Sequence, residues 1–80
     1  MNKHEILEEA LVAREQEIMG YQINIDNYTI ALEEISKLSV EEKAELSGFA
    51  DQLRTLLSSE KLEQKKAKIM FAVIQRQLNA

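Results

Sequence analysis

Two side chains near the start of the sequence have the types and spacing that could bind a metal ion. His4 and Glu8 lie four residues apart, so in a helix their imidazole and carboxylate would share one face. A metal site needs further ligands from a second segment and groups that orient them, and the sequence identifies none. We therefore predict no metal site and expect a solvated helix end.

Catalytic chemistry has even fewer candidate residues. The sequence has no cysteine nucleophile, no glycine-rich loop that would cradle a phosphate and no histidine beside a suitable serine. Paired carboxylates such as Glu33-Glu34 and Glu41-Glu42 are typical of solvated helix surface and do not suggest an enclosed acid-base site. The sequence predicts a protein that is not an enzyme, with no catalytic residues and no cofactor.

One arginine interrupts an apolar stripe of the sequence. Arg14 occupies a position that Leu, Ile and Tyr otherwise hold. A polar residue in such a stripe can fix the register in which helices pair, and Arg14 is the candidate for that register-setting role. In the alternative, which we favour, its aliphatic stem packs in the stripe and the guanidinium reaches out to Glu17, or across to Glu60 and Glu63.

Two tyrosines give the middle of the same stripe a polar, aromatic character. The patch comprises Tyr21, Asn24, Asn27 and Tyr28. Tyrosine is enriched where proteins bind partners, and the asparagine amides can donate and accept hydrogen bonds, so the patch is a candidate partner-binding site. The alternative, which we favour, is an internal hydrogen-bonded layer that fixes how the helices pair.

Charge is distributed unevenly along the chain. The net charge is −4, but residues 1 to 59 hold five Lys or Arg against twelve Asp or Glu, whereas residues 60 to 80 hold five against two. The four lysines between positions 61 and 68 could contact phosphates or a membrane surface, but Glu60 and Glu63 lie among them and no aromatic side chain does. We expect these lysines to lie beside the N-terminal glutamates of a folded-back chain, and we expect no binding to nucleic acid.

The spacing of the apolar residues predicts a long first helix. From Leu7 to Ile35 they recur in alternating steps of four and three, which is the pattern of a coiled-coil seam. Gly20 is the only poor helix former in this stretch, and the chain has no proline. We predict one helix over about residues 3 to 37.

Ser39 and Glu42 predict where a second helical arm starts, because a serine followed three residues later by a glutamate is a capping box. The chain would then turn at about residues 37 to 39, and about residues 40 to 78 would form one helix or two collinear ones. If this arm has a break, we expect it near Ser58-Ser59, because serines are weak helix formers and effective caps.

The two arms have matching lengths, which favours an all-α fold in which they pair as a long antiparallel hairpin. A chain of 80 residues is expected to form a single domain over residues 1 to 80. The alternative is a compact three-helix bundle, which would leave half of the long first helix uncovered unless that helix broke at Gly20.

Residues 69 to 74 would be apolar on every side of a helix, and such a helix needs cover on every side. One partner arm cannot provide that cover, so we predict a homodimer in which two hairpins form a four-helix coiled-coil bundle. A chain this small without cysteine lacks disulfides to stabilise it, which also favours association. The predicted interface residues are Ile6, Leu7, Leu11, Ile69, Met70, Phe71, Val73 and Ile74.

Together these features favour a small, acidic, non-catalytic protein that binds itself and another protein, as an adaptor does. The competing hypothesis is an inhibitor whose acidic surface mimics nucleic-acid phosphates and blocks a nucleic-acid-binding or defence protein. In its brevity and its lack of cysteine and proline the chain resembles the small helical accessory proteins that phages and mobile elements encode. We expect a cytoplasmic protein, because the N-terminus shows no export signal and no apolar run approaches the roughly 20 residues of a membrane span.

Overall fold

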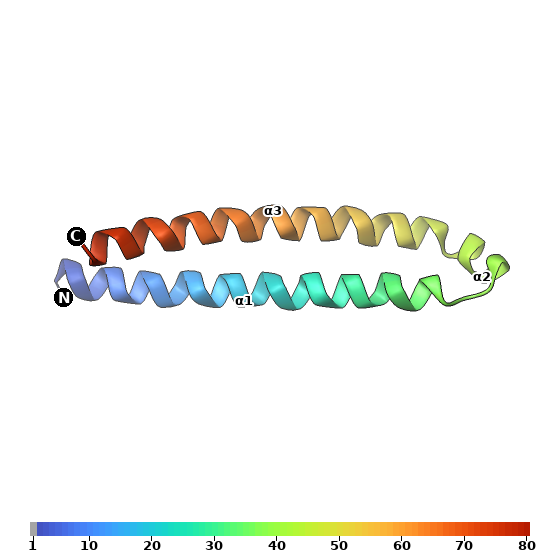
Figure 1. Cartoon of the computed structure of the whole chain (residues 1–80), viewed down its shortest axis with the longest axis horizontal. Coiled ribbons are helices and arrows are strands. Elements are labelled where there is room, and N and C mark those ends of the chain that lie inside the picture. The colour runs from blue at the N-terminus through green and yellow to red at the C-terminus, as the bar shows by residue number, and fades with distance from the viewer. Residues whose placement is uncertain (1) are drawn as a thin grey trace.

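The protein is a hairpin of two long helices that lie side by side and run in opposite directions (Figure 1). The computed structural model describes residues 2 to 80, in which α1 covers Lys3–Ser36, α2 covers Val40–Glu45 and α3 covers Ser47–Leu78. The hairpin measures 60 × 16 × 14 Å, and both ends of the chain lie at the same end of the long axis. The predicted all-α hairpin is confirmed, and the compact three-helix bundle is not what the chain forms.

The first helix begins and ends close to the residues that the sequence indicated. Asn2 caps it, because its side-chain oxygen accepts a hydrogen bond from the Glu5 backbone N–H at 2.9 Å. The helix then continues through Gly20 without a break and ends at Ser36, one residue before the predicted boundary. The helix does not break at Gly20, because the apolar seam before and after it packs against α3. That packing outweighs the low helix propensity of one glycine.

The turn between the arms uses the predicted capping serine. The Glu42 backbone N–H donates to Ser39 Oγ at 3.2 Å, and Ser39 Oγ donates to Glu42 Oε1 at 3.0 Å. The Glu42 carboxylate therefore accepts a hydrogen bond from the serine hydroxyl, whereas in a full capping box it accepts one from the serine backbone N–H. Ser39 starts the short helix α2, which ends after one and a half turns at Glu45.

The break in the second arm lies at Leu46, and the prediction of a break near Ser58-Ser59 was wrong. Both serines are exposed and helical within α3, where strongly helix-forming residues follow them. Leu46 is half-buried, and its backbone leaves helical geometry so that α2 can cross between the ends of the two long arms (Figure 1). Reversing the chain direction requires a bend at the tip of the hairpin, whereas nothing requires one midway along a straight arm.

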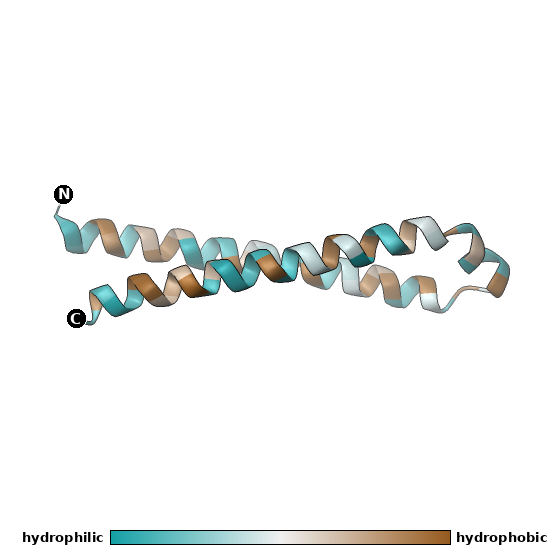
Figure 2. Ribbon diagram, turned by 90° about the horizontal axis from the view of Figure 1, so that it is seen from above, coloured by the Kyte–Doolittle hydropathy of each residue, from teal (hydrophilic) through white to brown (hydrophobic). Residues whose placement is uncertain are grey.

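The two arms pack along one coiled-coil seam. In α1 the seam follows the predicted alternation of four and three from Leu7 to Ile35, and Ile25 is its most buried member. The two arms cross at a shallow angle, and bands of apolar residues recur along both of them (Figure 2). On the other side the seam begins at Leu46, just before α3, and its positions within α3 are Ala50, Leu53, Leu57, Glu60, Gln64, Ala67, Phe71, Ile74 and Leu78.

The hairpin exposes more surface than a compact protein of its mass. The usual scaling of surface with mass gives about 4,900 Å² for a folded chain of 9.2 kDa. The hairpin exposes 5951 Å², which is roughly 1,000 Å² more. In residues 2 to 80 no large side chain is fully buried, and the buried hydrophobic residues are only Ile25, Ala50, Leu53, Ala67 and Ile74.

We predict that Gly20→Ala stabilises the protein. A Cβ atom added at Gly20 would meet no atom within 4 Å, and alanine is a far better helix former than glycine. The free energy of unfolding, measured by urea denaturation, should rise by about 0.5 to 1 kcal/mol. As a control, Gln16→Gly in the same helix should lower it. A loss of stability in Gly20→Ala would contradict the prediction and would mean that another backbone approaches Gly20 closely.

Candidate interaction surfaces

A layer of hydrogen-bonded polar side chains crosses the middle of the seam. Gln64 of α3 is only 8% exposed, and its amide nitrogen donates to the Ile18 carbonyl oxygen at 3.1 Å and to Gln22 Oε1 at 2.9 Å. One turn away, the Asn24 side-chain amide donates to Glu60 Oε2 at 3.3 Å. All three hydrogen bonds join α1 to α3, and no buried side-chain polar atom in residues 2 to 80 lacks a partner.

This polar layer favours a single register of the two arms. Sliding α3 by one heptad would separate Gln64 from Gln22 and Glu60 from Asn24, so these side-chain hydrogen bonds would break, at a cost of about 0.5 to 1.5 kcal/mol each. Apolar side chains at seam positions, in contrast, can pack against each other in several registers. A polar residue at a seam position is a known way to specify register at some expense of stability.

The sequence-based interpretation did not identify Gln64 or Glu60 as seam residues. The signal was present, because the steps of four and three run without exception from Leu46 to Leu78 and pass through both. The large apolar residues Phe49 and Leu56 belong to a neighbouring stripe of the same helix, which the structure leaves exposed.

The structure separates the four residues of the candidate partner-binding patch. Tyr21 and Tyr28 are half-buried seam residues that point toward the other arm, and Asn24 is half-buried in the polar layer. Asn27 alone is exposed. The patch is therefore not one continuous exposed surface in the single hairpin, and the internal layer accounts for Asn24.

Arg14 lies in the seam but makes its ion pair within its own helix. Its guanidinium contacts Glu17 Oε2 at 2.9 Å, and its side chain remains 38% exposed. Beside it runs a shallow groove of about 120 Å³, lined from α3 by Glu63, Lys66 and Met70. Whether Arg14 sets the register stays a prediction.

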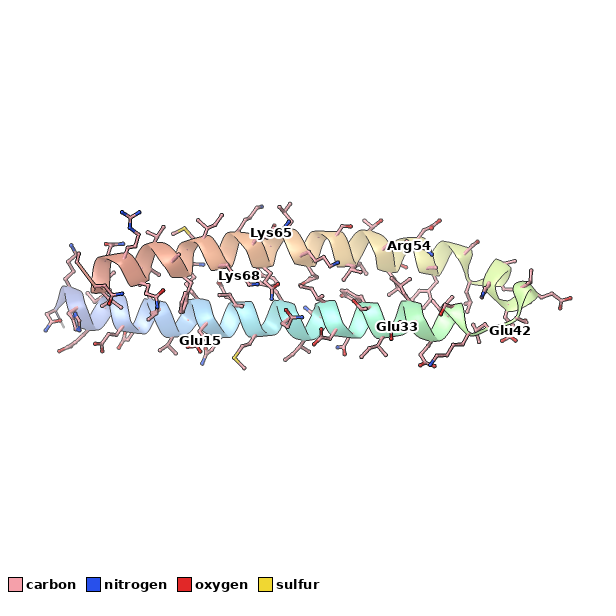
Figure 3. All side chains as sticks on the ribbon, viewed as in Figure 1. Glu15, Glu33, Glu42, Arg54, Lys65 and Lys68 are labelled. Atoms are coloured by element: carbon pink, nitrogen blue, oxygen red, sulfur yellow. The ribbon has the colours of Figure 1, made fainter. Side chains whose placement is uncertain are left out.

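The two arms carry opposite charge without direct ion pairs between them. Figure 3 shows that the labelled acidic residues Glu15 and Glu33 come from α1, whereas Arg54, Lys65 and Lys68 come from α3. Within residues 2 to 80 every ion pair joins neighbours three or four positions apart in one helix or at its end. These pairs are Arg14–Glu17, Glu34–Lys37, Asp51–Arg54 and Glu63–Lys66, and the His4 imidazole contacts the Glu8 carboxylate four positions along the same helix.

The predicted dimer-interface residues fall into two groups. Leu7, Leu11, Phe71 and Ile74 are half-buried or buried in the seam of the single hairpin. The other four point away from the seam and are 41 to 62% exposed. These four are Ile6, Ile69, Met70 and Val73.

Exposed apolar residues from both arms lie on one side of the hairpin, which we call the shared face. Glu17 of α1 and Met70 of α3 line the same groove, so these positions are on the same side of the seam. Residues one heptad or one turn from each of them continue this side along the helices. The apolar members of the shared face are Ile6, Ala10, Ala13 and Ala31 of α1 and Phe49, Leu56, Met70 and Val73 of α3.

A second apolar stripe lies on α1 alone, on the side away from α3. We call it the outer stripe, and it comprises Val12, Met19, Ile23 and Ile30, which are 53 to 60% exposed. Acidic and polar residues interrupt it, because Gln16 and Asp26 occupy the intervening helical positions.

Another hollow of the hairpin lies near its tip. It has a volume of about 360 Å³ and is open to solvent, with Lys43, Asp51 and Arg54 among its lining residues. Arg54 pairs with Asp51 at 2.8 Å, so the one carboxylate there is already neutralised. The described part of the chain has no group of three or more His, Asp or Glu side chains placed to hold a metal ion, and His4 and Glu8 form an exposed pair at 2.7 Å.

We predict that Gln64→Glu destabilises the hairpin. At neutral pH the change replaces an amide donor with a carboxylate facing the Ile18 carbonyl oxygen and the Gln22 side-chain oxygen, so two hydrogen bonds are lost and a charge is buried. The free energy of unfolding should fall by about 1 to 3 kcal/mol. The exposed Gln75→Glu in the same helix is the matched control and should change it little. Equal effects of the two changes would show that Gln64 is not buried in the seam.

No family model matches the chain, and neither does any curated protein or solved structure. The features that distinguish the hairpin are those described above: a polar layer inside the seam, a shared apolar face and two arms of opposite charge.

Proposed function

We propose that the protein is a non-catalytic interaction protein, an adaptor that associates with itself through one face of the hairpin and binds another protein through the rest. The observation that carries the proposal is the amount and position of exposed apolar surface. The excess of roughly 1,000 Å² over a compact chain of this mass is similar to the ~800 Å² that each partner covers in a standard interface.

The exposed apolar residues are too regular to be scattered surface residues. Phe49, Leu56 and Met70 occupy equivalent heptad positions of α3, with only Glu63 between them. Monomers rarely expose contiguous apolar patches of more than a few hundred Å², and larger patches mark binding sites. A two-helix hairpin is also marginally stable at this size, so a partner that covers the patch would stabilise it.

The distribution of carboxylates favours this adaptor over an inhibitor that mimics nucleic acid. Mimicry needs uncompensated carboxylates along one exposed face. Here Glu17 and Glu34 each contact a basic side chain, and Glu17 lies on the shared face with Lys66. The acidic residues of α1 lie around several sides of the helix and are not aligned along one exposed face.

The outer stripe is the place we propose for the other protein partner. It stays free when the shared face is covered, because it lies on the opposite side of α1 from the seam. Alternating apolar and polar positions along one helix are what a partner helix or groove recognises.

No helix within residues 2 to 80 has the length and apolar character needed to cross a membrane. We propose a cytoplasmic location.

We predict that the protein is a dimer in solution and that Met70→Glu converts it to a monomer. Light scattering after size exclusion should give about twice 9.2 kDa for the parent at both low and high salt, because apolar burial is not screened. Met70→Glu puts a charge on the shared face, whereas Ala72→Glu, two residues along the same helix, puts it on another side and should leave the dimer intact. A parent that is monomeric over a wide concentration range would rule out self-association.

A further inference from the structure

We infer that a second copy of this chain seats on the shared face with the tips of the two hairpins at the same end, so that α1 of each copy lies against α3 of the other. The inference rests on the proposed self-association and adds its face and its direction. Two arrangements with twofold symmetry can bring shared faces together. One keeps the tips together, and the other puts them at opposite ends and stacks α1 on α1 and α3 on α3.

The shared face is chosen over the outer stripe because both arms contribute to it. A second hairpin on this face would contact two helices at once and complete a four-helix bundle. Packing outer stripe against outer stripe would join the dimer through α1 alone and would leave Phe49, Leu56 and Met70 in water. Because it spans both arms, the shared face offers a wider contact than one helix can toward the ~800 Å² that each partner covers in a standard interface.

The charges of the arms decide the direction. Helix α1 carries two Lys or Arg against eight Asp or Glu, a net charge of −6, whereas α3 carries six against three, a net charge of +3. With tips together each acidic α1 stacks on the basic α3 of the other copy. With tips apart, α1 stacks on α1 and α3 on α3, so helices of like net charge lie against each other.

Local details of the shared face point the same way. The groove beside Arg14 brings Glu17 of α1 and Lys66 of α3 to the same level of the hairpin, so in the tips-together dimer each Glu17 would meet the Lys66 of the second copy. With tips apart, the half-buried Glu63 would lie near its own symmetry mate close to the middle of the interface. Such a pair of like charges destabilises an interface.

The sizes of the side chains are also complementary in the tips-together dimer. On α1 the apolar positions of the face are mainly alanines, whereas on α3 they are Phe49, Leu56, Met70 and Val73. The antiparallel register places Ala13 at the level of Met70, and Ala10 at the level of Val73. Large residues of one copy would therefore pack over small residues of the other, as close packing of facing layers requires.

Single cysteines test the arrangement directly, because the chain has no cysteine of its own. The variants Ala10→Cys and Val73→Cys place one thiol each at the same level of the shared face, on α1 and α3. Equal amounts of the two variants are mixed, unfolded and refolded together, and equilibrated in a glutathione buffer. The mixed disulfide should form at least about tenfold more than in a mixture of Ala10→Cys with Gln75→Cys, whose thiol lies on the opposite side of the hairpin, because held thiols have a high effective concentration.

A second pair of cysteine variants tests the arrangement in which the tips lie at opposite ends. With tips apart, Ala10 of one copy would face Ala31 of the other, so a dominant mixed disulfide between Ala10→Cys and Ala31→Cys would overturn the inferred direction and leave self-association standing. A parent of dimeric mass in which neither pair forms a disulfide would overturn the choice of face. A parent of monomeric mass would overturn the proposed self-association and, with it, this inference.

Discussion

Two helices can cover only one side of each other, and the other properties of this protein follow from that constraint. A single seam buries Ile25, Leu53 and Ile74, but it leaves no large side chain in the described chain fully enclosed. The apolar residues that do not fit in the seam have to stay in water or find cover from another molecule. The length of the hairpin, 60 Å, makes the exposed surface large for so small a chain.

The polar layer gives the seam specificity that its apolar residues cannot provide. Aliphatic side chains pack acceptably in several registers, whereas Gln64 finds the Ile18 carbonyl oxygen and the Gln22 side chain in only one. Burying amides in place of leucines lowers the attainable stability, so the seam combines limited strength with a defined register. Such a hairpin gains more from association than one with a wholly apolar seam.

Within the described residues, the charged side chains do not join the two arms by ion pairs, although the opposite net charges of the arms suggest that they would. The acidic first arm and the basic second arm lie side by side, but within residues 2 to 80 their ion pairs are made with neighbours in the same helix or at its end. Exposed pairs of this kind contribute little to stability. The opposite net charges of the arms act at longer range, where they favour one direction of helix packing over another.

The sequence by itself determined the helical arms, the turn at residues 37 to 39, the Ser39 cap and the first half of the seam, because these depend on local propensity and on a period that neighbouring residues share. Tertiary structure decided the rest. The bend at Leu46 arises because the chain must cross from one arm to the other, and the roles of Gln64 and Glu60 arise because Gln22 and Asn24 lie opposite them. Which apolar residues remain exposed was likewise decided by the pairing, since a residue's own helix does not determine which of its sides the partner covers.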